Sequence, residues 1–205
     1  MPLTSNFTDG TDMATVHAAH HNAMAEMLNA GLPPAPRYVS QRYYTQRINA
    51  GTVANYTSPA SQVAYLPVFI AADVTIDAVG INVTTAGSAN AVTRIGLYSV
   101  AANKPAARLY DWGGVATDTT GQKLITGLSV SLTVGYYCFA LSAANITPGV
   151  FNGAASTQVP MIGGGPTAFN DVNSYFENGT GVLPATASPS QTFTATLPLI
   201  AFKVA

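Results

Sequence analysis

The three histidines are the first residues of the chain that could do chemistry. His17, His20 and His21 lie in one short segment, and the i, i+4 spacing of His17 and His21 would put both on one face of a helix. That spacing can ligate zinc or nickel, but no Glu stands between them as in the HExxH motif, which argues against a metalloprotease. Two interpretations stay open: polar residues on a packed helix, which we favour, and a metal shared across a symmetric assembly. We expect no metal and no other cofactor.

The serines and acidic residues do not form an enzymatic pattern. A serine hydrolase needs a histidine beside its nucleophile, yet all histidines belong to one segment and no GxSxG motif is present. The glycines at 163–165 lack the Lys and Ser/Thr that complete a phosphate-binding loop. A glycosidase needs two close carboxylates, and the candidate pairs are Asp73 with Asp77, Asp111 with Asp118, and Asp171 with Glu177. With so few acids, we expect no enzymatic activity.

Aromatic residues flanked by Asn and Asp are the best candidates for a ligand site. An aromatic ring can stack on the apolar face of a sugar while amides and carboxylates bond its hydroxyls. One candidate set is Tyr110, Asp111 and Trp112. The other lies within 163–191 and comprises Phe169, Asn170, Asp171, Asn173, Tyr175 and Phe176. The alternative for both sets is that their rings close the edge of the hydrophobic core.

A single helix is predicted ahead of all other elements. Residues 13–30 are rich in Ala and Met and contain no Pro or Gly, Thr11 and Asp12 precede them as possible caps, and Gly31 follows as a stop. One stripe of this helix is formed by Met13, Val16, His20, Met24 and Met27. No second local helix can cover the stripe, so we expect it to contact another chain or the following domain.

Short runs of β-branched and aromatic residues follow from about Val63. They predict strands over 63–71, 74–84, 92–100, 107–110, 122–132, 135–142, 157–162 and 192–204. About eight strands without intervening helices predict a mainly β fold, an antiparallel two-sheet sandwich of jelly-roll type.

The alternation of apolar and polar residues in two predicted strands predicts which side chains face the core. Leu128, Val130 and Leu132 should face inward, and Ser129, Ser131 and Thr133 outward. The inward face of the strand over 74–84 switches near Val79, which predicts a β-bulge at Gly80.

Charged residues are scarce, which excludes several classes of partner. Eight Lys and Arg and nine Asp and Glu make up 8% of 205 residues, with a net charge of −1, whereas about 25% is usual. No basic surplus exists to bind DNA or RNA. The best apolar run, over 65–72, is far shorter than the roughly 18 residues of a membrane span, so we expect no membrane insertion. The first ten residues show no secretion signal.

The single cysteine, Cys138, excludes internal disulfides and a cysteine-based zinc site, and we expect it to be a small buried hydrophobe.

Three regions are expected along the chain: a helical anchoring segment over 1–32, a linker over 33–61 and a β-domain over 62–205. The linker contains Arg37, Arg42 and Arg47 among the tyrosines Tyr38, Tyr43, Tyr44 and Tyr56. It could form a basic and aromatic ligand groove, but we favour a linker that its tyrosines pack on the β-domain and whose arginines pair with a neighbouring chain.

Several motifs in order resemble a known family. They are the "VGINVTTAG" and "RIGLY" segments within 65–100, "ARLYDWGGV" at 107–115, "LTVGYY" at 132–137, "GVLPAT" at 181–186 and the final apolar run at 197–202. Together they resemble the small appendage domains of tailed-bacteriophage virion proteins, which include tail fibre, minor tail and receptor-binding proteins. The chain departs from the usual turn after "IGLY", where it has Ala101–Pro105.

This resemblance implies a β-sandwich, often trimeric, that is displayed on a virion and used in attachment to the host. It also implies that the N-terminal helix anchors the chain to other virion proteins. The leading hypothesis is that loops of the sandwich then bind a host-surface carbohydrate. The alternative is a capsid or tail decoration protein with a purely structural role.

Overall fold

The computed structural model describes residues 38–45, 53–57, 62–143, 150–154, 174–179, 181–189, 191–193 and 197–205. All of them belong to one compact unit, residues 38–205. The predicted helix, with Met13, Val16, His17, His20, His21, Met24 and Met27, lies outside the described residues, as does the predicted strand over 157–162.

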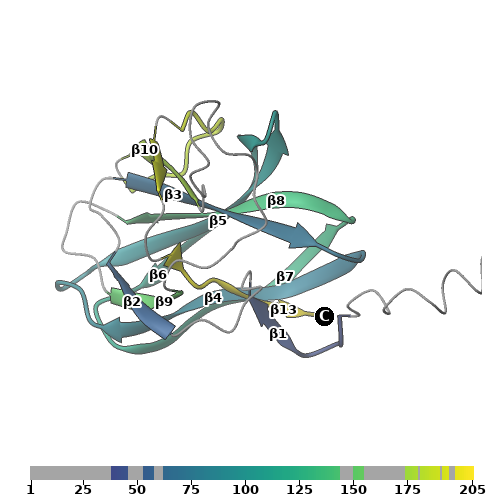
Figure 1. The fold of residues 1–205 in the computed structure, drawn as a ribbon. Helices are drawn as coiled ribbons and strands as arrows, with labels where there is room; N and C mark the ends of the chain where they lie inside the picture. The colour runs from purple at the N-terminus through teal and green to yellow at the C-terminus, as the bar shows by residue number, and fades with distance from the viewer. Residues whose placement is uncertain are drawn as a thin grey trace, which may run out of the picture. The chain divides into compact units, whose positions relative to one another are not determined.

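The described residues form a mainly β structure of two antiparallel sheets (Figure 1). The seven-stranded sheet runs β1 (Tyr43–Thr45), β13 (Ala201–Val204), β4 (Val74–Thr85), β9 (Val150–Ala154) and β12 (Leu197–Pro198), with β2 (Val53–Thr57) paired to β9 and β7 (Gly121–Leu132) paired to β4. The six-stranded sheet runs β11 (Gln191–Phe193), β10 (Ser174–Asn178), β3 (Gln62–Ile70), β8 (Gly135–Ala143), β5 (Val92–Ala101) and β6 (Lys104–Ala116). In the described part of the chain there is no helix, and thus none long and apolar enough to span a membrane.

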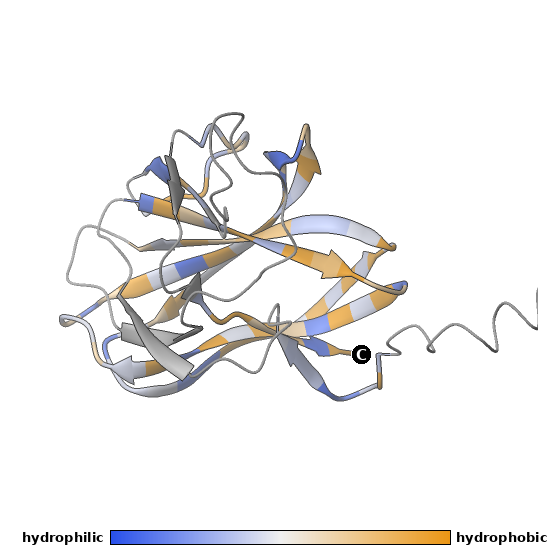
Figure 2. Cartoon of the chain, in the orientation of Figure 1, coloured by the Kyte–Doolittle hydropathy of each residue, from blue (hydrophilic) through white to orange (hydrophobic). Residues whose placement is uncertain are grey.

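One hydrophobic cluster joins the inner faces of both sheets. Alternate residues of β3, including Leu66 and Ile70, pack with Ile76 and Val79 of β4 and with Phe139 of β8. Hydrophobic residues recur along the strands of both sheets (Figure 2), as a two-layer arrangement requires. The predicted two-sheet core is confirmed.

The alternation predicted for β7 is confirmed. Val130 and Leu132 are buried and Leu128 packs partly against the core, while Ser129, Ser131 and Thr133 are exposed. Cys138 is fully buried, as predicted.

The face switch in β4 occurs, but its bulge lies three residues before the predicted site. The register of β4 with β7 shifts between Ile76 and Ala78, and β13 shifts against the same position. Against β13, Asp77 is the extra residue. Against β7 the extra residues belong to β7, because Gly127, Leu128 and Ser129 stand opposite Asp77 alone. On the facing strand, Gly127 has a φ of 74°, so the glycine that this irregularity uses belongs to β7 rather than to β4.

Strands also form in the stretch over 33–61, for which a linker is predicted from the sequence. β1 pairs with β13, and β2 pairs with β9. Tyr38 and Tyr44 pack on Phe202, with ring centroids 5.8 Å away in both cases. These tyrosines hold the stretch to the core, as expected, but β1 is too short to produce a readable period.

Predicted strand limits differ in two further places. The strand expected over 107–110 extends as β6 over Lys104–Ala116. The run expected over 192–204 contains three separate strands, β11, β12 and β13.

A second cluster covers part of the outer face of the six-stranded sheet. Tyr65, Tyr98 and Tyr175 pack there with Leu183, which belongs to residues 181–189, here called the strap. The strap extends the sheet at β6 through a bridge between Ala107 and Thr186. The Tyr98 hydroxyl donates a hydrogen bond to the Pro184 carbonyl at 2.5 Å.

Candidate functional site

The first predicted ligand set lies together on edge strand β6, where the Trp112 ring packs partly against the core and the Tyr110 ring stacks on it. The Trp112 ring packs against Phe139, with centroids 6.1 Å apart. Tyr110 stacks on Trp112 at 5.9 Å with an angle of 11° between the ring planes, and the Tyr110 side chain is 38% exposed. One face of Trp112 is thus occupied by Tyr110, which leaves Tyr110 as the outermost ring of the set.

Asp111, between these rings, is fully engaged within the protein. Its carboxylate accepts hydrogen bonds from Arg94 Nη2 at 3.1 and 3.2 Å and from the Gly113 amide at 3.1 Å. It also forms an ion pair with Arg108 at 3.5 Å. These bonds fix the edge strand to β5, and they occupy the carboxylate that was expected to bond sugar hydroxyls.

The second predicted set is placed only in part. Phe169, Asn170, Asp171 and Asn173 lie outside the described residues. Tyr175 and Phe176, on β10, are 4% and 3% exposed, and the Tyr175 hydroxyl donates to the Asn103 carbonyl at 2.7 Å. Burial raises the pKa of Tyr175. Neither ring offers an open face to a sugar, so both fit the alternative of aromatics that close the core.

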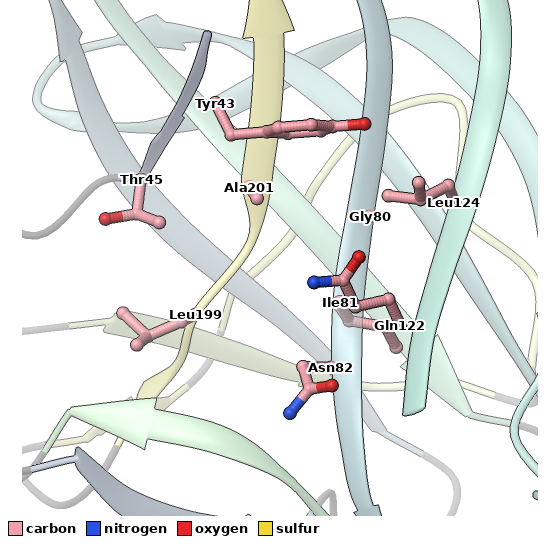
Figure 3. Close-up of a pocket in the computed structure, with 9 residues that line it drawn as sticks. All are labelled: Tyr43, Thr45, Gly80, Ile81, Asn82, Gln122, Leu124, Leu199 and Ala201. Carbon is pink, nitrogen blue, oxygen red and sulfur yellow. The ribbon is translucent and has the colours of Figure 1, made fainter. Parts of the chain in front are cut away.

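A different site appears on the outer face of the seven-stranded sheet. A cavity of about 250 Å³, here called the hollow, opens across four strands (Figure 3). It is lined by Tyr43, Thr45, Gly80, Ile81, Asn82, Gln122, Leu124, Leu199 and Ala201.

The register of the sheet creates the hollow. Thr45 of β1 pairs with Ala201 of β13, Ala201 pairs with Gly80 of β4, and Gly80 pairs with Leu124 of β7. Directly paired residues of antiparallel strands share one face. The row therefore has its two smallest side chains in the middle and larger ones at both ends.

Two further rows flank this central row. On one side Tyr43 pairs with Lys203, and on the other Asn82 pairs with Gln122. The Tyr43 ring extends from β1 toward β4, and the Gln122 side chain extends from β7 toward β4 (Figure 3). An aromatic ring thus stands at one end of the hollow and two amides at the other.

Gly80 is required at the floor because β7 approaches it closely. A Cβ atom at this position would lie 2.4 Å from the Lys123 carbonyl oxygen and 2.5 Å from Leu124 Cδ2. Any larger residue would push β7 away. The low floor leaves Tyr43 and Leu124 raised on either side, 48% and 40% exposed.

The lining is electrically neutral. None of the nine described residues around the hollow carries a charge. Lys203, in the row of Tyr43, forms an ion pair with Asp77 at 2.9 Å, and Lys123 donates to the Thr119 hydroxyl at 2.6 Å. The site therefore offers an aromatic ring, an apolar floor and uncharged hydrogen-bonding groups.

Sequence reasoning missed this site except at Tyr43, which belongs to the Arg and Tyr stretch weighed as a ligand groove. Gly80, Asn82, Gln122 and Ala201 come from three strands whose register no motif specifies. The only sequence signal for the hollow was the small size of residues 80 and 201. Their size indicates a depression in the sheet surface only when it is known that the two residues pair with each other.

Within the described ranges, no group of three or more His, Cys, Asp or Glu side chains is arranged to hold a metal ion. In comparisons with protein families and with curated proteins, the chain matches no family model and no curated sequence.

Proposed function

We propose that the chain is the display module of a tailed-bacteriophage virion appendage and attaches the particle to a host-surface glycan through the hollow. The observation that carries this proposal is the raised, half-exposed Tyr43 ring beside the low floor of Gly80 and Ala201. An exposed ring next to amide and hydroxyl groups is the arrangement that binds a sugar by stacking and hydrogen bonding.

The architecture supports a display role. In this proposal the two sheets form a jelly-roll-like sandwich, the outer face of one sheet presents the hollow, and residues 1–32 join a trimer to other virion proteins. The motifs at 65–100 and 107–115 that resemble phage appendage domains form β3 to β6. Few charges and many Thr, Ser and Asn residues suit a surface that works outside the cell.

Binding is favoured over catalysis because of the chemistry of the lining. Asn82, Gln122 and Thr45 neither gain nor lose a proton near neutral pH. Apart from the Tyr43 hydroxyl, the described lining of the hollow therefore has hydrogen-bonding groups but no carboxylate, imidazole, amine or thiol to act as a general acid or base.

A cell-binding assay with two matched tyrosine variants tests the proposal. Tyr43→Ala should weaken binding of the full chain to the bacterium that propagates the phage by about 5- to 150-fold, the equivalent of ~1–3 kcal/mol for a lost stacking platform by analogy with bases. Tyr136→Ala is the control, because Tyr136 is 47% exposed on the other sheet and contacts Phe69 rather than the hollow. Equal binding by both variants would contradict attachment through the hollow. Wild-type protein that coats particles but never binds cells would indicate the decoration role.

A further inference from the structure

We infer that the hollow accepts a single uncharged pyranose unit and discriminates against sugars that carry a carboxylate, sulfate or phosphate. The inference rests on the proposed glycan attachment and specifies its ligand. It is carried by the size of the hollow, the absence of charge from its described lining and the placement of its two amides.

Size limits the ligand to one sugar unit. The cavity of about 250 Å³ lies below the ~300–1,000 Å³ of typical small-molecule sites. Its floor is two residues wide, Ala201 and Gly80, with Tyr43 and Leu124 raised at its sides. A pyranose ring can rest on this floor with its C–H face against the Tyr43 ring, while the rest of the glycan leaves toward solvent.

Charge is the second argument. An anionic group that enters the hollow loses part of its hydration. This loss is unfavourable unless a cationic side chain of the protein compensates for it. No described lining residue supplies one. The amine nearest in register, Lys203, is held by Asp77 at 2.9 Å, and the Asp77 carboxylate would itself repel an anion. Lys123 is held by Thr119.

The amides are the third argument. Asn82 and Gln122 lie opposite each other on β4 and β7, and each amide both donates and accepts hydrogen bonds. A sugar hydroxyl can also donate and accept. The two amides can therefore either donate hydrogen bonds to neighbouring hydroxyls or accept hydrogen bonds from them. A carboxylate or sulfate group only accepts, so where it replaces a hydroxyl the amide oxygen at that contact loses a donor.

The experiment uses matched sugars on one carrier and the full-length chain. Glucose, galactose and N-acetylglucosamine are compared with glucuronate, galacturonate and sulfated N-acetylglucosamine, beside whole cells of the propagating bacterium. We expect at least one neutral sugar to bind, its anionic counterpart to bind at least about tenfold more weakly, and the neutral binding to be unchanged between about 50 mM and about 500 mM NaCl.

Two variants link the preference to the hollow. Ala201→Leu fills the floor and should abolish sugar binding. Gln122→Lys places a cation at the exposed end of β7 and should improve binding of the anionic counterparts by up to about fivefold. Unchanged melting temperatures show that both variants remain folded.

The outcomes separate the inference from the proposed function. A wild-type preference for anionic sugars, with binding that falls as salt rises, overturns the inference while glycan attachment stands. Sugar binding that Ala201→Leu leaves intact overturns the assignment to the hollow. A wild-type chain that binds neither the cells nor any sugar overturns attachment, and the inference with it.

Discussion

Phe202 holds the floor of the hollow to the core. It is 1% exposed and stacks on Phe139 at 5.9 Å and on Tyr44 at 5.8 Å. Its neighbours Ala201 and Lys203 lie on the opposite face of β13, so the hollow and the core share one short strand.

Phe202→Ala should lower the free energy of unfolding by ~3–5 kcal/mol, because it removes a large ring from a closed aromatic cluster. Urea denaturation of the full chain measures the change. Val182→Ala is the control, since Val182 is 58% exposed and should shift stability by less than about 0.5 kcal/mol. A loss below about 1 kcal/mol for Phe202→Ala would show that the cluster does not bear on stability.

Cys138 should make the folded state sensitive to alkali. Burial raises the pKa of its thiol to about 12, whereas an unfolded thiol has a pKa of about 8.5. The neutral thiol's contribution is thus fully present below about pH 8.5 and is lost as the pH rises toward 12. The free energy of unfolding of the wild-type chain should fall across this range. That of Cys138→Ala should fall less steeply.

Urea midpoints at several alkaline pH values measure the decline. Some slope should remain in Cys138→Ala, because burial also raises the pKa of Tyr98 to about 12. A thiol that reacts with a disulfide reagent as fast in the folded chain as in urea would contradict its burial.

At the scale of elements, the strap depends on a buried carboxylate. Glu177 of β10 is 9% exposed and accepts a hydrogen bond from the Tyr65 hydroxyl at 2.8 Å and another from the Ser188 amide. The carboxylate therefore connects β3, β10 and the strap over the outer face of the six-stranded sheet.

Tyr65→Phe should lower the free energy of unfolding by ~1–3 kcal/mol, since the buried carboxylate of Glu177 loses a donor. It should also speed proteolysis within the strap, residues 181–189. Tyr136→Phe removes an exposed hydroxyl and should change neither quantity. Equal stability of the two variants would mean that the Tyr65 hydroxyl does not hold the strap.

The sequence predicted elements better than it predicted their pairing. The alternation of β7 was readable because a buried face repeats every second residue. The bulge lies at Asp77 rather than at Gly80 because β13 pairs with β4 in a register that leaves Asp77 unpaired, while the matching irregularity against β7 lies in β7 itself. The hollow could not be predicted, since Gly80, Ala201 and Leu124 meet through pairings between residues far apart in the chain.

For the whole molecule, residues 38–205 should fold alone, because this unit contains both sheets and the hydrophobic core between them. Removal of residues 1–37 should leave the urea midpoint nearly unchanged. The proposed trimer should become a monomer in light scattering, and the proposed incorporation into phage particles should be lost. A truncated chain that does not fold would place the N-terminal segment in the core. A full-length chain that stays monomeric would contradict the trimer.

The most direct test of glycan attachment through the hollow is a chemical-shift map of the isotope-labelled full chain, titrated with the purified surface polysaccharide of the propagating bacterium. We predict that the largest backbone amide changes fall on Tyr43, Thr45, Gly80, Asn82, Gln122 and Ala201, which the register brings together on one face. Changes that cluster instead around Tyr110 or the strap, or that fail to appear at all, would contradict the account.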